Sequence, residues 1–302
     1  MALTTATGET RTRLSARFGA APAPVRSAVQ AVDKVGDGVA GAGMFLLFSW
    51  RVLYHLVTDV ILKLRFRRTV IMHMNDIALG SGAFVIGGGM IFVVAAMALA
   101  VGGAVGVQAA AGLSQVGAES YVGLVGAFAH TREVGPLITG LCLIAVVGAD
   151  FTAQIGAMRI SDEIDALETM SIPSIVYLVC TRLAAIVLAL VPLYMVSMFV
   201  LFFATRLVNV EQFDMSPGQY DYYFHLYLPP IDVLYSVIKV VVFCVEICLI
   251  HSYYGYFASG GPVGVGQAVG IAIRNSIIAV VTTNLLLSYL FWAGTPTVSL
   301  TG

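Results

Sequence analysis

Residues 152–173 read TAQIGAMRISDEIDALETMSIP and lie between two stretches that are long and apolar enough to cross a bilayer. Ser161 is a residue type favoured at a helix N-cap, and Asp162 and Glu163 suit the positive end of a helix dipole. Pro173 supplies a stop. We therefore expect a short acidic helix where a simple loop would suffice to join two spans.

This short helix is expected to be amphipathic. Its apolar side chains recur at three- and four-residue spacing and share one face: Ile160, Ile164, Leu167 and Met170. Its carboxylates spread over the remaining surface: Asp162, Glu163, Asp165 and Glu168. Such a face suits a membrane domain on which a cytoplasmic partner must push. The alternative is a solvated amphipathic helix without a partner.

The composition places the chain in a membrane. Hydrophobic residues make up 59% of it, charged residues only 11%, and the mean hydropathy is +0.90. Soluble domains carry roughly a quarter charged residues. A net charge of −1 without a basic cluster gives no sign of nucleic-acid binding. The four cysteines lie in apolar runs and are interpreted as small core residues: Cys142, Cys180, Cys244 and Cys248.

Four segments are expected along the chain. Residues 1–28 have the composition of a disordered cytoplasmic tail, and residues 29–75 form an interfacial amphipathic region. Within it, charges interrupt the apolar stretch 44–64 and favour a helix that lies in the membrane surface rather than across it. Residues 76–293 form the membrane domain, and residues 294–302 form a short outward-facing tail.

Five membrane spans fit the charge-free runs of this domain. They are expected near residues 77–102, 121–150, 174–204, 231–257 and 267–292. A polar, aromatic loop at 206–230 and a Gly-rich loop at 259–266 would connect the later spans. Ten of the sixteen Lys and Arg residues lie within 11–68, which places the N-terminus in the cytoplasm and the C-terminus outside.

Motifs for catalysis are absent from the sequence. The glycine runs 87–89 and 260–266 invite a nucleotide-binding interpretation, but neither is followed by the lysine that a Walker A loop needs. The five histidines are scattered singly, whereas a metal site needs several ligands that converge. We therefore expect no enzymatic site and no cofactor on this chain. ATP and magnesium would be bound by a different polypeptide.

Three motifs resemble the signature of MlaE/YrbE permeases: REVGP at 132–136, TAQIGAMR at 152–159 and EIDALETM at 163–170. The stretch YGYFASGGPVGVGQAV at 254–269 resembles the second signature of this family. The similarity covers about residues 45–293 and is strongest to the actinobacterial (mycobacterial) YrbE type, in particular its B subunit. The resemblance implies an all-α integral membrane fold, with an interfacial elbow helix, five spans and a cytoplasmic coupling helix between spans two and three.

The resemblance also implies a function and partners. Such a chain is the permease of an ATP-driven Mce lipid importer in the inner membrane, where it moves fatty acids, mycolate-related lipids or sterols. Its partners would be a second YrbE-type permease (the A subunit), a cytoplasmic ABC ATPase dimer and Mce proteins on the periplasmic side. The coupling helix would contact the ATPase through a set of nine residues: Ser161, Asp162, Glu163, Ile164, Asp165, Ala166, Leu167, Glu168 and Met170.

Charged residues inside the spans are the remaining site candidates, because ionisable groups are costly there unless they meet a partner or a cavity. Arg132 and Glu133 either line the lipid path or dimer seam, or form a structural pair at the outer rim. Consecutive helical residues point about 100° apart, so each is expected to meet a different group. Lys239 and Glu246 lie two turns apart on one face and are interpreted as an intramembrane structural pair, with substrate contact as the alternative.

Three positions depart from the family pattern. Many members have Glu where this chain has Gln154, and many carry Arg and Asp where Val146 and Asn284 stand. The loss of three charges fits one half of a heterodimer whose halves have diverged. Two rival functions stay open. One is an ion-coupled secondary transporter, and the other is a structural anchor for the Mce tube that leaves lipid to the A-type partner.

Overall fold

The computed structural model describes residues 23–63, 66–79 and 89–293, and within these ranges the regular elements are helices, without a strand. The chain divides into two compact units, Met1–Arg51 and Val52–Gly302. The described part of the first unit belongs to α2 (Ala23–His55), so residues 23–28 of the expected disordered tail are helical. The rest of that tail, residues 1–22, and the expected tail 294–302 lie outside the described residues.

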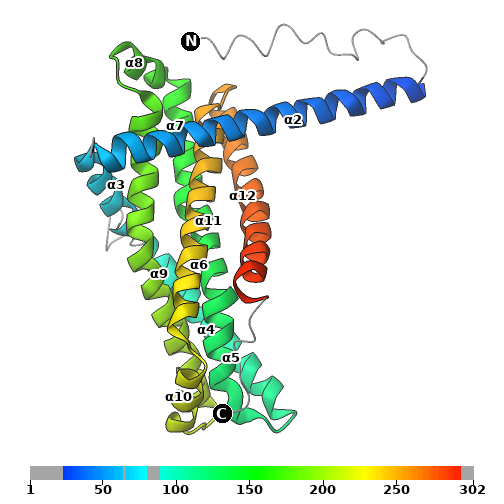
Figure 1. The fold of residues 1–302 in the computed structure, drawn as a ribbon, viewed down its shortest axis with the longest axis vertical. Coiled ribbons are helices and arrows are strands. Elements are labelled where there is room, and N and C mark those ends of the chain that lie inside the picture. Colours follow the sequence, from blue (N-terminus) through cyan, green and yellow to red (C-terminus); the bar gives the residue numbers. More distant parts are fainter. Residues whose placement is uncertain (1–22, 64–65, 80–88, 294–302) are drawn as a thin grey trace. The chain divides into compact units, whose positions relative to one another are not determined.

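The second unit is a bundle of helices (Figure 1). Three of its elements are short: α3 (Arg67–Leu79), α8 (Glu163–Thr169) and α10 (Pro217–Leu226). The longer single helices are α4 (Gly89–Ser114), α9 (Thr181–Leu207), α11 (Pro230–Tyr256) and α12 (Gly261–Trp292). Several π-helical turns continue or precede them: η1 (Leu56–Leu62), η5 (Val176–Cys180) and η6 (Val208–Gln212).

Residues 119–160 form one almost unbroken helical path, built from short helices and π-helical turns. Its parts are η2 (Glu119–Tyr121), α5 (Val122–Ala129), η3 (His130–Val134), α6 (Gly135–Leu143), η4 (Ile144–Gly148) and α7 (Ala149–Ile160). A π-helical turn holds one more residue than an α-helical turn and changes the direction in which the following side chains point. The turn η3 contains both charged residues that the sequence singles out in this span, Arg132 and Glu133.

Helix packing in the second unit depends on close backbone approach. α9 packs along α4 and α3, and α11 packs against α7 and α12. A Cβ atom added at Gly102 of α4 would lie 2.7 Å from the carbonyl oxygen of Leu201 on α9, and one added at Gly255 of α11 would lie 3.0 Å from the carbonyl oxygen of Thr152. These contacts leave room only for glycine. All four cysteines are free and buried, as expected of small core residues.

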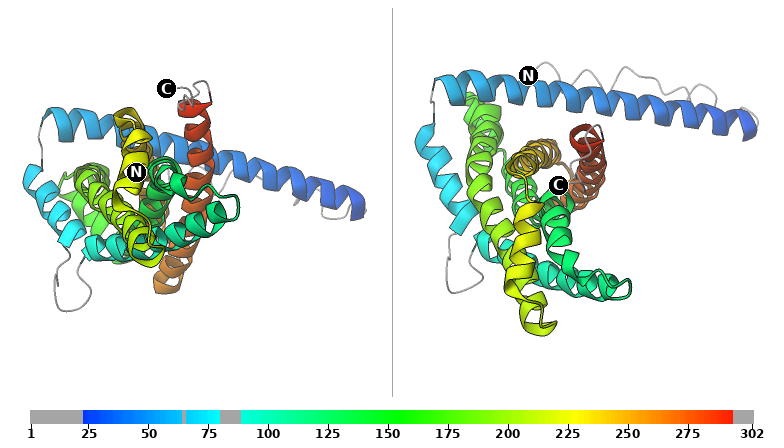
Figure 2. Two further views of the ribbon diagram at one scale, coloured as in Figure 1. Left: turned by 90° about the horizontal axis from the view of Figure 1, so that it is seen from below. Right: turned by 60° about the horizontal axis from the view of Figure 1, so that its bottom comes forward.

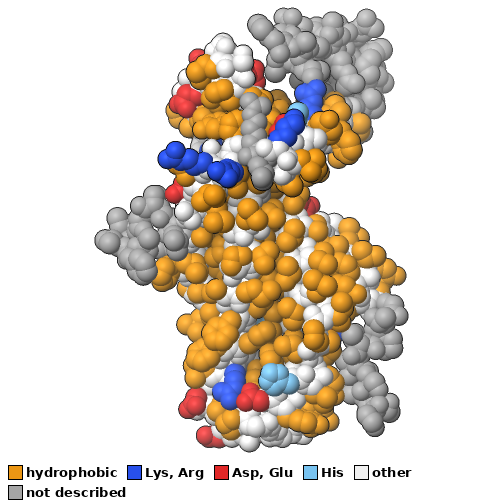
Figure 3. All heavy atoms as spheres, turned by 60° about the vertical axis from the view of Figure 1, so that its left-hand side comes forward, with side chains coloured by type: hydrophobic (Ala, Val, Ile, Leu, Met, Phe, Trp, Pro, Cys, Tyr) orange, Lys and Arg blue, Asp and Glu red, His pale blue; other side chains and the backbone are white. Residues whose placement is uncertain are grey.

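The two ends of the second unit carry different short helices. α10 lies against α5 at one end, and α8 lies at the opposite end (Figures 1 and 2). Between the ends, the face drawn in Figure 3 is mostly hydrophobic, while charged side chains gather toward the ends. This distribution is what a bilayer requires of a protein that crosses it.

Six helical stretches among the described residues are long and apolar enough to cross a membrane, so the chain is a multi-pass membrane protein. Five of these stretches correspond to the five expected spans, and the sixth, Gly38–Leu62, which we expected to lie in the interface, also has the length and composition of a span. Within this segment, Asp59 is paired with residues one helical turn away on either side. It bonds His55 Nδ1 at 2.9 Å and Lys63 Nζ at 2.8 Å.

The expected boundaries of the first span were wrong. The helix runs over Gly89–Ser114 instead of 77–102, and residues 80–88 lie outside the described part. Because no charge occurs between Asp76 and Glu119, hydropathy alone does not locate a span within this run. The expected loops are also shorter. α12 begins at Gly261 inside the Gly-rich loop 259–266, and α10 occupies part of the loop 206–230.

Candidate functional site

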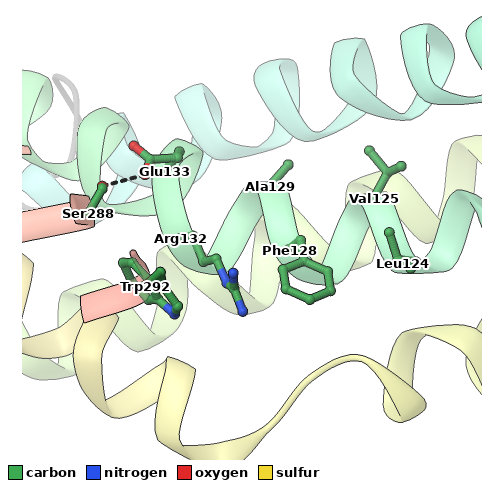
Figure 4. A pocket seen from close by; sticks show the side chains of 8 residues that line it. All are labelled: Leu124, Val125, Phe128, Ala129, Arg132, Glu133, Ser288 and Trp292. Carbon is green, nitrogen blue, oxygen red and sulfur yellow. Dashed lines mark hydrogen bonds between the residues drawn. The ribbon is translucent and has the colours of Figure 1, made fainter. Parts of the chain in front are cut away.

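A cavity of about 430 Å³ opens between the α5–η3 segment and the C-terminal part of α12 (Figure 4). Its size is in the range of small-molecule sites. One wall is apolar and comes from α5: Leu124, Val125, Phe128 and Ala129. The other end is polar and combines η3 with α12: Arg132, Glu133, Ser288 and Trp292. The cavity therefore has the amphiphilic lining that a molecule with an apolar chain and a polar head would need.

Arg132 is held on one edge and on both faces. Its Nε and one Nη donate to Asp232 Oδ2 on α11, at 2.9 and 2.7 Å. The guanidinium carbon lies 4.1 Å from the ring centre of Phe128 and 5.1 Å from that of Trp292, within the range of cation–π attraction. The indole of Trp292 donates to the other oxygen of Asp232 at 2.9 Å. Asp232 is only 2% exposed, so this ion pair is shielded from competing solvent.

Glu133 has its own set of partners. Its carboxylate accepts hydrogen bonds from Asn284 Nδ2 at 2.6 Å and from the hydroxyl of Ser288, both on α12. Lys239 Nζ of α11 lies 3.5 Å from Glu133 Oε1. The Glu133 side chain is 42% exposed although it is bonded, so it is the acidic group that the cavity presents.

Lys239 is fully buried and completes this network. Its ammonium group donates to the backbone carbonyl of Arg132 at 2.6 Å and to Ser288 Oγ at 2.8 Å. In an α-helix the Arg132 carbonyl would accept from the N–H four residues later, but Pro136 has none. The REVGP motif thus leaves a backbone acceptor that the lysine uses. Two cations and two carboxylates meet here, so their formal charges cancel.

Only part of this site was foreseeable. The expectation that Arg132 and Glu133 meet different groups is confirmed by their separate partners on α11 and α12. Lys239 and Glu246 make structural bonds to neighbouring helices but not to each other, because Glu246 accepts from Thr283 Oγ1 of α12 at 3.1 Å. Two helical turns separate the two side chains by about 10 Å along the helix axis, so each bonds a closer partner on a neighbouring helix. Asp232 was missed, since a carboxylate in the first turn of a helix has an ordinary explanation in the helix dipole.

The acidic segment 152–173 is divided between two helices. Residues up to Ile160 continue α7, and α8 begins only at Glu163. The expected N-cap, Ser161, instead donates from Oγ to the carbonyl of Ala157 at 3.0 Å at the end of α7. Asp162 takes the N-cap position with a left-handed backbone (φ 58°), which redirects the chain into α8. The expected apolar face also splits, because Ile164 is 1% exposed whereas Met170 is 62% exposed.

α8 is tied to the end of the bundle by polar contacts. Arg159 on α7 forms an ion pair with Asp165 at 3.0 Å. Glu168 Oε1 accepts from the hydroxyl of Ser174 at 2.8 Å and from the hydroxyl of Tyr256, the last residue of α11, at 3.4 Å. The same Ser174 and Tyr256 hydroxyls lie 3.0 Å apart. Most other side chains of α8 are exposed, so the helix has an outer surface that the bundle does not cover.

The positions that depart from the family pattern take part in polar contacts or stay at the surface. Gln154 donates to Asp150 at 2.7 Å and accepts from the buried Arg182 at 3.0 Å, so its amide links a carboxylate to a guanidinium. Asn284 is the donor to Glu133 described above. Val146 is half-buried in η4.

The aromatic residues of the 206–230 segment differ in their exposure. Tyr220 is 1% exposed and Tyr222 is 63% exposed, because α10 turns one side toward α5. Close contact to Tyr220 explains two glycines of α5. A Cβ atom at Gly123 would lie 2.5 Å from the Tyr220 carbonyl oxygen, and one at Gly126 would lie 2.9 Å from its hydroxyl. Among the residues that the structure describes, no group of three His, Cys, Asp or Glu side chains is arranged to hold a metal ion.

Apolar helices of spanning length define this chain as a polytopic membrane protein, and an open cavity with a charged end lies between α5, η3 and α12. The chain belongs to the MlaE permease family, because the profile of the family described as Permease MlaE matches residues 80–290. This range includes α8 and the cavity residues other than Trp292.

Named relatives agree with this assignment. A probable ABC transporter permease protein of Rickettsia prowazekii is 35% identical over 191 residues, which cover 63% of this chain and 74% of the relative. A probable ABC transporter permease protein of Synechocystis is 31% identical over 204 residues, or 66% and 78% of the two chains. The chloroplastic protein TRIGALACTOSYLDIACYLGLYCEROL 1 of Arabidopsis thaliana is 29% identical over 194 residues, or 64% and 55%. The chain is thus the permease of an ABC-type transporter, a class that works with an ATPase partner.

Proposed function

We propose that this chain is a permease subunit that moves hydrophobic lipids across or out of the inner membrane interface in an ATP-driven Mce complex. Its partners in this proposal are a second, A-type permease, a cytoplasmic ABC ATPase dimer and periplasmic Mce proteins. Import of fatty acids, mycolate-related lipids or sterols is the proposed direction and substrate class. The MlaE family and the ABC permease relatives support the general class, and one relative is named after a glycolipid.

The lining of the cavity is the observation that carries the lipid assignment. Four apolar side chains of α5 face a polar end in which the carboxylate of Glu133 is accessible and Arg132 is held by Asp232. An apolar chain gains from burial against the α5 wall, whereas a head group with hydrogen-bond donors finds an acceptor in Glu133. A site for a small inorganic ion would need several converging ligands instead of an apolar wall.

The ATPase would act on this cavity through α8. ATP and magnesium belong to the partner in this proposal, and this chain supplies the surface on which the partner moves. The exposed side of α8 and its ties to α7 and α11 support that role. An ion-coupled secondary transporter would leave this surface without a role. A structural anchor would leave the amphiphilic cavity without one.

Purification of the complex in mild detergent, followed by mass spectrometry of the co-purifying proteins and lipids, tests this function. We expect an ATPase, a second permease and Mce chains, together with a bound lipid. A lone monomer or a simple homodimer that transports without an ATPase would support the secondary transporter instead.

The Glu133→Ala variant tests the role of the cavity. We expect lipid uptake to fall while the ATPase and Mce chains still co-purify, because the carboxylate faces the cavity and its partners keep other bonds. The partners on α12 can bond each other or water, and Lys239 retains the Arg132 carbonyl and Ser288. Glu133→Gln, which keeps an acceptor oxygen without the charge, is the matched control for shape. Wild-type uptake in Glu133→Ala would remove Glu133 from the lipid path, and loss of the complex would make it a structural residue.

A further inference from the structure

His130 is the first residue of η3, the π-helical turn that contains Arg132 and Glu133, but it points away from the cavity. Its side chain is fully buried, and its Nε2 lies 2.6 Å from Thr205 Oγ1 on α9. The ring also packs near Phe202 of α9, with 6.1 Å between ring centres. Nothing in the lipid-binding role described above uses this histidine.

The direction of the hydrogen bonds follows from the hydroxyl of Thr205. This hydroxyl donates its one proton to the carbonyl of Gly102 on α4, at 2.8 Å. It must therefore accept from His130, whose Nε2 carries the proton. Asn209 Nδ2 donates to the carbonyl of Thr205 at 2.7 Å and fixes the same turn of α9. The result is a chain of hydrogen bonds that runs from η3, called the pocket turn below, through α9 to α4, and all of its groups are buried.

The backbone of the same residue closes the π-helical turn. The carbonyl of His130 accepts the N–H of Gly135, five residues later. A Cβ atom at residue 135 would lie 2.6 Å from that carbonyl oxygen and 2.6 Å from Met198 Sδ, so only glycine fits here. His130 thus holds the turn by two hydrogen bonds. Its carbonyl bonds Gly135 within the same helix, and its imidazole bonds Thr205 on α9.

The turn decides where the two charged side chains point. A π-helical turn accommodates one residue more than an α-helical one, so its conversion to α-helix would rotate the preceding residues by about 100° relative to α6. Such a rotation would move Arg132 away from Asp232 and Glu133 away from Asn284. The geometry of the cavity in Figure 4 depends on the turn staying as it is.

We propose that His130 is a positioning residue that holds the pocket turn through Thr205 and thereby sets the lipid affinity of the cavity. The inference rests on the proposed function, since only a cavity that lipid enters gives the turn a consequence for transport. His130 itself does not contact lipid. It acts through Glu133 and Arg132.

Three variants of His130 in the assembled complex test this proposal. His130→Gln places an amide donor near the position of Nε2, His130→Asn is too short to reach Thr205, and His130→Leu has no donor. With a fluorescently labelled sterol as the probe, whose hydroxyl can donate to Glu133, we expect His130→Leu and His130→Asn to raise the half-saturating concentration roughly three- to tenfold, with a smaller change in maximal rate. His130→Gln should restore values near the wild type. Equal behaviour of all three variants would overturn the proposal.

A double variant, in which His130→Leu is combined with Glu133→Gln, separates positioning from a general loss of structure. In Glu133→Gln the effect of His130→Leu on half-saturation should shrink, because one of the two groups through which it acts has changed. Full additivity of the two changes would contradict the proposal. Thr205→Val should behave as His130→Leu does, and Thr205→Ser, which keeps the hydroxyl, should behave as the wild type.

A measurement without lipid keeps this test independent of the proposed function. Ala129→Cys places a thiol in the cavity wall, while the native cysteines are buried. Its reaction with a water-soluble maleimide should slow at least about threefold when His130→Leu is added, and the added His130→Gln should leave it unchanged. If the complex fails to bind the labelled sterol but the thiol responds, the substrate proposal fails and the positioning proposal stands. An unchanged labelling rate in His130→Leu would overturn the positioning proposal whatever the lipid result.

Discussion

Close contacts at glycines have an energetic consequence that can be measured at single residues. A Cβ atom at Gly148 would lie 2.7 Å from the imidazole of His251, and that ring is held by Thr152 Oγ1 at 2.7 Å. Gly112 on α4 has no heavy atom within 4 Å of the same added Cβ. The two glycines therefore make a matched pair, one at a helix contact and one at an open position.

We expect Gly148→Ala to lower the free energy of unfolding by about 1–3 kcal/mol, because the buried ring cannot move without losing its hydrogen bond. Gly112→Ala should be neutral or stabilising by up to about 1 kcal/mol, since alanine favours the helix. Thermal unfolding in detergent measures both. A similar loss in the two variants would show that glycine is needed for a reason other than the contact with His251.

For single residues, the sequence identifies charged side chains within a span more readily than it identifies their partners. Arg132 and Glu133 stand out because charges are expensive within a span. Their partners lie about 100 to 155 positions away in the sequence, at Asp232, Asn284 and Ser288. Helical periodicity describes only one helix at a time, so it places Lys239 and Glu246 on one face without naming their partners on neighbouring helices. The π-helical turn at His130–Val134 has no periodic signature, although Gly135 and Pro136 mark it in retrospect.

Among the elements, α8 carries the proposed contact with the ATPase. Ile164 points inward and Met170 outward, so the two apolar ends of the expected face have different roles. We expect Met170→Asp to release the ATPase while the permease stays inserted, since a charge buried at an interface without a partner typically costs several kcal/mol. Co-purification of the ATPase measures this. Ile164→Ala is the companion variant and should reduce permease stability instead. Wild-type ATPase recovery with Met170→Asp would exclude this side of α8 from the contact.

At the opposite end, Asp221 of α10 forms a two-pronged ion pair with Arg206, with N–O distances of 2.8 and 2.9 Å. The hydrogen bond from Arg206 lowers the pKa of Asp221 below its usual value. A carboxylate with a lowered pKa stabilises the fold at pH values above its unfolded pKa, and this contribution is lost as the pH falls through the folded value. The pair is partly exposed, so its contribution is about 0.2–1 kcal/mol.

We therefore expect the stability difference between wild type and Asp221→Asn to be the same at about pH 7.5 and pH 5.5 and to shrink at about pH 3.5. Thermal unfolding of the two proteins at each pH measures it. A difference that already disappears at about pH 5.5 would mean that the carboxylate is not held in its charged form by Arg206.

Element boundaries were less predictable than element types. Helical spans followed from hydropathy. The third expected span agrees closely with η5 and α9 taken together, and the fourth agrees with α11. The first span moved by about a dozen residues, because a run without charges contains no marker for its ends. Ser161 was taken as the start of a helix although it ends one, since the same hydroxyl can bond either an N–H ahead or a carbonyl behind.

For the whole permease, the open question is how an event at α8 reaches the cavity. α11 spans this distance as one continuous helix, with Tyr256 at one end and the cavity partners Asp232 and Lys239 toward the other. The 24 residues between Asp232 and Tyr256 correspond to about 36 Å. Hydropathy predicts this helix, but it says nothing of which residue at its end contacts α8. Tyr256 bonds Glu168 and Ser174, so a displacement of α8 pulls directly on the end of α11.

We predict that Tyr256→Phe uncouples ATP hydrolysis from lipid movement. The change removes one hydroxyl and keeps the ring, so the fold and the ATPase contact should persist. Motion of α8 would then reach α11 only through packing, and fewer lipids should move for each ATP hydrolysed, by roughly two- to tenfold if one hydrogen bond carries the link. Tyr254→Phe is the matched control, because it removes the same group two residues earlier, where the hydroxyl bonds Asn275 of α12 at 2.6 Å instead of α8. Parallel assays of ATP hydrolysis and lipid transport in the reconstituted complex give the ratio. An unchanged ratio in Tyr256→Phe, or an equal drop in both variants, would place the link between α8 and the cavity elsewhere, with α7 as the next candidate through the Arg159–Asp165 pair.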